Sequence, residues 1–284
     1  YHSLYVDVNG ALWAMGDNSK GQLGDGTIIN RSTPVKIVNS GVTAVAAGQY
    51  HSLFVKSDGS LWAMGNNANG QLGDGSTTQR NSPVQIVANG IEFVSAGQHH
   101  SLFLTTGSIL KAMGGNAHGQ LGDGSTTQRT SPVQIATTVT GSAAGGLHSH
   151  FIKSDGSLWS TGYNFYGQLG NGATSSLSTP VKVINSGVTQ IRGGSEHSVF
   201  LKTGDSLWAM GANVHGQLGD ASTTARSTPI QIATGITAAA AGVDHSLLLK
   251  TDLTYWATGR NDYGQLGDTT TTGRLSPVRA TVGP

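Results

Sequence analysis

The stretch AAGQYHSLFVKSDGSLWAMGNNANGQLGDGSTTQRNSPVQIV, residues 46–87, holds most of a unit that recurs along this chain. Its HSLFVK segment alternates apolar and polar residues, as a half-buried strand does. SDGS is typical of a tight turn, and LWAMG indicates the next strand. NNANGQLGDGSTTQRN is a polar, glycine-rich loop, and SPVQIV is a further apolar run. With VTAVAAG at 42–48 as the first strand, the unit is predicted to be a four-stranded meander.

The residue types also predict which strand takes which place in the meander. Pro83 opens the last strand, and proline cannot donate to a ladder, so we expect that strand to be an outer edge. The alanine-rich first strand suits a crowded inner position. No segment of the unit has the i, i+3, i+4 spacing of apolar residues that a helix needs.

Three markers place six such units in one register, with steps of 48 or 49 residues. The HS motif begins at His2, His51, His100, His148, His197 and His245. The glutamines of GQLG are Gln22, Gln71, Gln120, Gln168, Gln217 and Gln265, and Pro34, Pro83, Pro132, Pro180, Pro229 and Pro277 follow the same steps. A repeated four-stranded meander of this period predicts an all-β fold, a β-propeller of six four-stranded blades, with residues 1–284 as a single domain.

The repeat resembles that of the regulator of chromosome condensation (RCC1) family. The shared pattern is a small-residue strand ending in Gly, HS followed by two apolar residues, G-x-apolar-aromatic-x-x-G, N-x-x-G-Q-L-G and a Pro-led strand. The resemblance covers essentially the whole chain and implies a scaffold that binds other proteins. It does not select among the exchange factors, chromatin readers, ubiquitin-ligase modules, bacterial effectors and secreted β-lactamase inhibitors of the family. Low divergence between the units makes the array look bacterial.

The first unit is short, because nothing in it matches residues 42–49 of the second. One blade is therefore predicted to lack its inner strand. Either a six-bladed ring closes with a three-stranded blade, or the chain is a fragment of a longer or, as the resemblance implies, seven-bladed array. An unpaired inner edge is a liability, which favours a fragment or a ring completed by a partner, with possible self-association through the open blade edge.

Composition narrows the function classes. The chain has 16 basic and 15 acidic residues, a net charge of +1 and no Cys. We expect no nucleic-acid partner, because binding through phosphates requires a far more basic surface. We expect no membrane insertion, since no apolar run approaches the length of a membrane span. Few charges, no Cys and much Ser, Thr and Gly predict an extracellular or cell-surface location in a bacterium.

Nothing in the sequence indicates catalysis, so we predict no enzyme, no catalytic residues and no cofactor. Glu92 and Glu196 are the only glutamates, and no H-E-x-x-H motif occurs. A ring of the six HS histidines could hold a metal, and the Asp-rich loops could bind calcium, but each loop offers a single carboxylate. We therefore predict no metal site. Nucleotide exchange, as the resemblance implies it, needs an inserted wedge, for which the constant step leaves no room.

Residues shared by all units are expected to be structural. We predict that each HS histidine bonds a neighbouring loop and locks blade to blade, and that Asn18, Asn67 and their counterparts cap turns. An Asp after GQLG and an Arg six residues later are predicted to pair and tie down the long loop. Both change together in the fourth unit, to Asn171 and Leu177. Lys111 replaces the third-strand Trp of the other units, so that position must reach water.

Function is expected where the units differ. The loops after the first and third strands of a meander lie on one face, and their variable positions are rich in Tyr, Phe, His and Arg, as interface anchors are. The predicted partner-binding residues are Tyr50, His99, His118, Tyr163, Phe165, Tyr166, Glu196, His215, Asp244, Arg260 and Tyr263. The sequence thus predicts a non-catalytic scaffold with a protein partner. A glycan-binding surface module and a self-assembling structural repeat protein remain alternatives.

Overall fold

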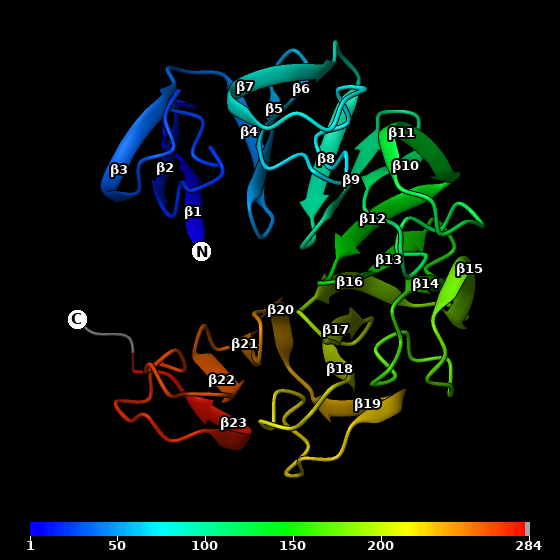
Figure 1. Ribbon diagram of the computed structural model, residues 1–284. Coiled ribbons are helices and arrows are strands. Elements are labelled where there is room, and N and C mark those ends of the chain that lie inside the picture. Colours follow the sequence, from blue (N-terminus) through cyan, green and yellow to red (C-terminus); the bar gives the residue numbers. More distant parts are fainter. Residues whose placement is uncertain (282–284) are drawn as a thin grey trace. The chain divides into compact units, whose positions relative to one another are not determined.

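The computed structural model describes residues 1–281, and every regular element in that range is a β-strand. The strands form six antiparallel sheets in the described range, and in each sheet the neighbours follow chain order (Figure 1). The part of the chain that the structure describes has no helix able to cross a membrane. The all-β prediction is confirmed. Residues 282–284, the end of the predicted single domain, lie outside the described residues.

The chain divides into two compact units, Tyr1–Ala144 and Gly145–Pro284. In the first unit, repeat 1 contains β1 (His2–Val6), β2 (Leu12–Gly16) and β3 (Arg31–Val38). Repeat 2 contains β4 (Val42–Ala47), β5 (His51–Lys56), β6 (Leu61–Gly65) and β7 (Arg80–Val87). Repeat 3 contains β8 (Ile91–Ala96), β9 (His100–Thr105), β10 (Leu110–Gly114) and β11 (Arg129–Ala136), and β12 (Val139–Ala144) ends the unit.

The second unit begins with the rest of repeat 4, which contains β13 (His148–Lys153), β14 (Leu158–Gly162) and β15 (Leu177–Ile184). Repeat 5 contains β16 (Val188–Gly193), β17 (His197–Lys202), β18 (Ser206–Gly211) and β19 (Arg226–Ala233). Repeat 6 contains β20 (Ile236–Ala241), β21 (His245–Lys250), β22 (Tyr255–Gly259) and β23 (Arg274–Arg279).

The predicted order of strands in a blade is confirmed. In repeat 2 the alanine-rich β4 is one edge of the sheet and the proline-bearing β7 is the other. The sheet of repeat 1 has three strands in the described residues, with β1 at its edge, as the missing inner strand predicts. That the chain is one domain stays a prediction.

The proline does not open its strand, contrary to our expectation. β7 begins at Arg80, three residues before Pro83, and Arg80 lies opposite Gly65 of β6. The register shifts between Ala63, which pairs with Val84, and Gly65, so Pro83 falls in a bulge on the outer edge. A proline is tolerated there because no ladder bond needs its missing N–H.

Inside each unit, the facing sheets of successive repeats pack on each other through apolar faces. The forward face of repeat 2, which includes Leu53 and Leu61, packs on Phe103 and Met113 of repeat 3. The backward face of repeat 2, formed by Phe54 and its neighbour Met64, packs in turn on repeat 1. The core is therefore a series of joints between successive repeats, as in other repeat proteins whose units bury their faces against each other.

A polar contact lies inside each joint. His51 Nε2 lies 2.9 Å from the Ser101 hydroxyl of the next repeat, and that hydroxyl donates to the Gln71 carbonyl at 2.7 Å. Because the serine proton goes to the carbonyl, His51 must donate its Nε2–H to the serine. The structural role predicted for the histidines is confirmed, but the partner is a serine in a strand of the next repeat and not a loop.

His51 and His197 are neutral in the fold. Burial lowers the pKa of both His51 and His197 to about 3, with nearby histidines adding to the effect. The ring of His197 lies against Gly194, where a Cβ would collide with it. A glycine is therefore required at that position so that the ring can enter the joint.

Candidate partner-binding site

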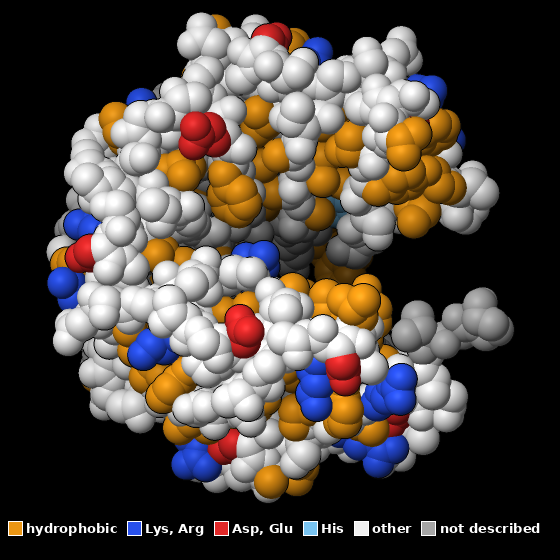
Figure 2. All heavy atoms as spheres, turned by 180° about the vertical axis from the view of Figure 1, so that it is seen from behind, with side chains coloured by type: hydrophobic (Ala, Val, Ile, Leu, Met, Phe, Trp, Pro, Cys, Tyr) orange, Lys and Arg blue, Asp and Glu red, His pale blue; other side chains and the backbone are white. Residues whose placement is uncertain are grey.

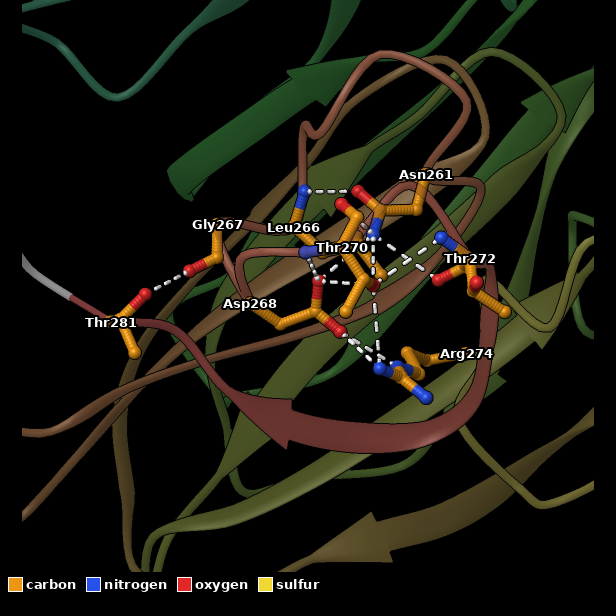
Figure 3. A network of polar contacts seen from close by, with 8 residues as sticks. All are labelled: Asn261, Leu266, Gly267, Asp268, Thr270, Thr272, Arg274 and Thr281. Atoms are coloured by element: carbon orange, nitrogen blue, oxygen red, sulfur yellow. Dashed lines mark hydrogen bonds and ion pairs between the residues drawn. The ribbon is translucent and has the colours of Figure 1, made fainter.

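The loop after the third strand is held by one buried asparagine in each repeat. In repeat 6, Asn261 accepts the Leu266 N–H at 3.0 Å and donates its amide to Asp268 Oδ1 at 3.0 Å (Figure 3). Asp268 also accepts from Arg274 Nε at 2.7 Å, and the two form an ion pair. This arrangement is here called the loop frame, and it confirms that the asparagine caps the turn, with Asp268 and Arg274 joined to it.

The predicted Asp–Arg pair is present in the five repeats that carry both residues. Hydrogen bonds from Thr270 above all, with Arg274 adding to them, lower the pKa of Asp268 to about 2. In repeat 4 the frame survives without charge, because Asn171 Oδ1 accepts from the Asn164 amide at 3.1 Å. The pair therefore supports the loop but is not needed to form it.

The two variable loops meet at the same end of each repeat, as predicted. The N–H that precedes the frame asparagine donates to a carbonyl of the first loop: Asn66 to Tyr50 at 2.8 Å and Arg260 to Asp244 at 2.9 Å. The same bond recurs in all six repeats of the described chain. These backbone bonds define the loop end, the surface on which the variable side chains stand.

The first unit contains three of the predicted site residues. The Tyr50 ring lies 6.0 Å from that of Tyr1. His99 is half-buried, and burial lowers its pKa. The His118 N–H donates to the Gln120 side chain at 3.0 Å, so its backbone is held by the loop motif.

The second unit brings three predicted aromatic residues together. Phe165 stacks on Tyr163 with ring centroids 6.4 Å apart, and its ring meets that of Tyr166 edge-on at 5.0 Å. Phe165 remains 64% exposed, whereas Asn164 between these aromatics is fully buried. The loop frame thus presents a preassembled aromatic cluster to solvent.

Charged side chains continue from this cluster across the loop end of the second unit. Burial, with Glu196 close by, raises the pKa of Tyr163, and burial with Asp244 nearby raises that of Glu196. Arg260 lies 3.5 Å from Asp244 and 2.6 Å from Asp262. The aromatic cluster is therefore followed by carboxylates that share one arginine.

The remaining predicted residues, His215 and Tyr263, are exposed, with Tyr263 at 86%. Their backbone N–H groups donate to Gln217 and Gln265, so their positions are set by the same motif. Val214 and Val243, both strongly exposed, belong to the same loop end but are not among the predicted site residues. Both valines occupy positions that vary between the repeats, and this variation could have identified them. They were not selected because the prediction favoured aromatic and charged residues.

No constellation for metal binding is seen in the described part of the chain, where no three His, Asp or Glu side chains come close enough to hold an ion. The histidines of the HS motifs are spread over successive joints, as His2, His51, His148 and His197 are. The loop aspartates are engaged by asparagine and, in five repeats, by arginine.

Repeated antiparallel meanders, joined face to face and capped by one loop motif, define a repeat protein built from β-propeller blades. The chain belongs to the family of the regulator of chromosome condensation (RCC1) repeat, whose model matches residues 9–55, 58–104, 155–201 and 205–249. A second model of the same repeat matches residues 42–71 and 188–217. Six blades, one with three strands, are present in residues 1–281.

Solved structures show the same fold. The chain is similar to Prp20p from Saccharomyces cerevisiae, with a TM-score of 0.87, 22% identity, and coverage of 99% of this chain and 75% of that one. It is also similar to human WBSCR16, with a TM-score of 0.78, 25% identity, and coverage of 88% and 69%. The comparison with curated protein sequences gave no match.

Proposed function

We propose that this chain is a non-catalytic scaffold that binds a protein partner through its loop end, with the aromatic cluster of the second unit as the main anchor. The observation that carries the proposal is the contrast within one loop: Asn164 is buried and bonded, while Phe165 beside it is exposed and stacked. Exposed aromatics on a rigid frame lose little conformational freedom on binding, which favours them as hot spots.

The solved relatives support a protein partner. One was crystallised as yeast RCC1 (Prp20) with Kap60 bound, and Prp20p was studied for binding to Gsp1p and histones. Sequence identities of 21% and 22% show a shared fold but do not show that the partner is shared, so the partners of these relatives are not assigned to this chain. Its net charge of +1 does not favour binding to a phosphate backbone. A bacterial cell-surface or extracellular location stays a prediction from composition.

The test begins by finding the partner with a photo-crosslinking amino acid at position 165, in extracts of the source cells. The same amino acid at position 93 is the matched control, because Phe93 is an exposed phenylalanine in the middle of β8 and away from the loop end. A protein crosslinked from position 165 and not from 93 is then purified for affinity measurements.

The triple variant Tyr163→Ala, Phe165→Ala, Tyr166→Ala should weaken binding of that protein by more than about 2 kcal/mol, or roughly 30-fold in Kd. Its unfolding transition should stay close to that of the parent, because these side chains lie at the surface. Unchanged affinity would remove the site from the proposal, and crosslinking to glycans alone would replace the protein partner by the glycan alternative.

A further inference from the structure

One carboxylate at the loop end of the second unit lacks the cation that its counterpart has. In repeat 6 the Arg260 N–H donates to the Asp244 carbonyl, and the Arg260 guanidinium lies 3.5 Å from the Asp244 carboxylate. In repeat 5 the same backbone bond joins Ala212 to Glu196 at 2.9 Å, so an alanine stands where repeat 6 has its arginine. Within residues 1–281, the Glu196 side chain forms no hydrogen bond or ion pair.

The register of the repeats places the aromatic cluster beside this carboxylate. In the first unit, Gly115 precedes the frame asparagine of repeat 3, and a Cβ on it would lie 3.3 Å from that of His99 and 3.5 Å from that of Asn69. The third-strand loop of one repeat therefore lies beside the first loop of the next repeat. At the positions of His99 and Asn69, the second unit has Glu196 and Tyr166.

The electrostatics of the second unit agree with this placement. Burial, and then the charge of Glu196, raise the pKa of Tyr163, so the carboxylate lies close to that ring. Glu196 is itself half-buried, and its pKa is raised by burial and by Asp244. Phe165 stacks on Tyr163 and remains exposed to solvent. An exposed aromatic surface and a carboxylate without a cation are thus neighbours in one unit.

The charge of the surface as a whole does not select a cation. The chain has 16 basic and 15 acidic residues, and acidic side chains are scattered among uncharged ones on the face that Figure 2 shows. Recognition of a cation must therefore come from local groups. An aromatic face attracts a cation through its π electrons and a carboxylate attracts it by charge, so the aromatic cluster and Glu196 favour the same kind of ligand.

We propose that the protein partner places an arginine side chain on the aromatic cluster, with its guanidinium paired to the Glu196 carboxylate. This inference rests on the proposed function and specifies the chemistry of the partner. Arginine fits better than lysine, because its planar guanidinium stacks on an aromatic ring and donates two N–H groups to one carboxylate. The contact gives Glu196 the ion pair that Arg260 gives Asp244 in repeat 6.

The first test uses peptides as probes and does not need an identified partner. The full chain carries 4-fluorophenylalanine at position 165, and ¹⁹F NMR reports binding there. The same label at position 93 is the matched control, because Phe93 is an exposed phenylalanine of β8, away from the loop end. The probe is a pentapeptide with blocked ends, Gly-Ser-Arg-Ser-Gly. Its control peptide has citrulline in place of arginine, which keeps the planar end group without the charge.

At low salt, the arginine peptide should shift the signal at position 165 and bind about 5-fold more tightly than the citrulline peptide, the upper end for a partly exposed ion pair. Glu196→Gln should abolish this preference. Glu92→Gln should keep it, because Glu92 is the other glutamate of the chain and lies on β8. Equal binding of the two peptides, or no shift at position 165 with millimolar peptide, overturns the proposal.

The protein crosslinked from position 165 provides the second test. Glu196→Gln should weaken its binding by about 10-fold and make the affinity less dependent on salt, whereas Glu92→Gln should do neither. If the triple alanine variant of the aromatic cluster weakens binding but Glu196→Gln behaves like Glu92→Gln, the proposed function stands and the arginine contact is wrong. If the peptide preference depends on Glu196 but no protein crosslinks, the arginine site stands and the proposed function fails.

Discussion

The joint between repeats 5 and 6 and the loop end of the second unit are built from adjacent residues, yet they obey different rules. His197 is buried, bonded to Ser246, and burial lowers its pKa to about 3. Glu196, the residue before it, is half-exposed, and its pKa is raised by burial and by Asp244. A residue in a joint must pack and form hydrogen bonds with a neighbour that is the same in every repeat. A residue at the loop end is in contact with solvent and is not restricted in this way. The repeats are therefore uniform where they touch each other and diverge where a partner can reach them.

The largest expected difference between the two regions comes from one substitution made in each. Phe200→Ala empties a fully buried position of a joint and should lower the free energy of unfolding by about 3–5 kcal/mol. Phe165→Ala at the loop end should change it by less than about 0.5 kcal/mol. Urea denaturation of both variants checks the comparison. Similar losses would mean that the aromatic cluster is part of the core.

The second prediction concerns acid sensitivity of the joints. His51, His150 and His197 have a pKa lowered by burial to about 3 in the fold. Below the ordinary value of 6.5 the unfolded chain therefore binds protons that the folded chain does not. Stability should be lost as the pH falls from 6.5 towards 3, by up to about 1.4 kcal/mol per pH unit for each histidine. The unfolding midpoint in urea, measured from pH 7 to pH 4, reports this slope.

Repeat 4 allows the acid effect to be isolated. His150 bonds the Ser160 and Ser198 hydroxyls at 2.7 Å each, whereas repeat 2 has Leu53 and Ala63 at the positions of His150 and Ser160. The double variant His150→Leu, Ser160→Ala copies repeat 2 and should make the pH dependence shallower by one histidine. Ser160→Ala alone is the control and should keep the full slope. An unchanged slope in the double variant would show that His150 does not contribute.

The third prediction tests how much the ion pair adds to the loop frame. Asp220→Ala leaves Arg226 and the Asn213 amide without their common acceptor, and should cost about 1–3 kcal/mol. Asp220→Asn with Arg226→Leu copies repeat 4 and should cost less than about 1 kcal/mol, because Arg226 is partly exposed. Thermal unfolding of the two variants compares them. Equal losses would contradict the view that the frame survives without charge.

The smallest effect is expected where repeat 3 departs from the others. Lys111 lies opposite Phe103, where Trp62 in repeat 2 stacks on Phe54 with ring centroids 6.1 Å apart. The Trp62 indole also donates to Ser60 at 2.9 Å, but repeat 3 has Ile109 in place of that serine. Lys111→Trp with Ile109→Ser should stabilise by about 0.5–1 kcal/mol, and Lys111→Trp alone by less. A loss of stability in the double variant would show that the stacking of Trp62 on Phe54 cannot be reproduced in repeat 3.

Much of the fold could be predicted from the sequence, because every repeat packs in the same way and carries the same residue types at the same positions. The strand order, the short first blade, the asparagine frame and the Asp–Arg pairs were all predictable from residues in one register. The start of the outer strand was not, because the bulge around Pro83 depends on how Arg80 pairs with Gly65 across the sheet. The histidine partner was also missed, since Ser101 is 50 residues from His51 and belongs to the next repeat.

The sequence by itself determined the repeat, its family and the positions that vary, because periodicity and residue type are local properties. Only the tertiary structure decided that Tyr163, Phe165 and Tyr166 touch one another, and that Asp244 lies close enough to Glu196 to raise its pKa. It alone revealed that Leu247 and Tyr255 of repeat 6 line a cavity, whereas Val199 and Leu207 at the same positions of repeat 5 are buried. Burial is the physical reason that these features could not be predicted. It depends on which surfaces meet in space, and residue types that repeat along the chain do not specify this.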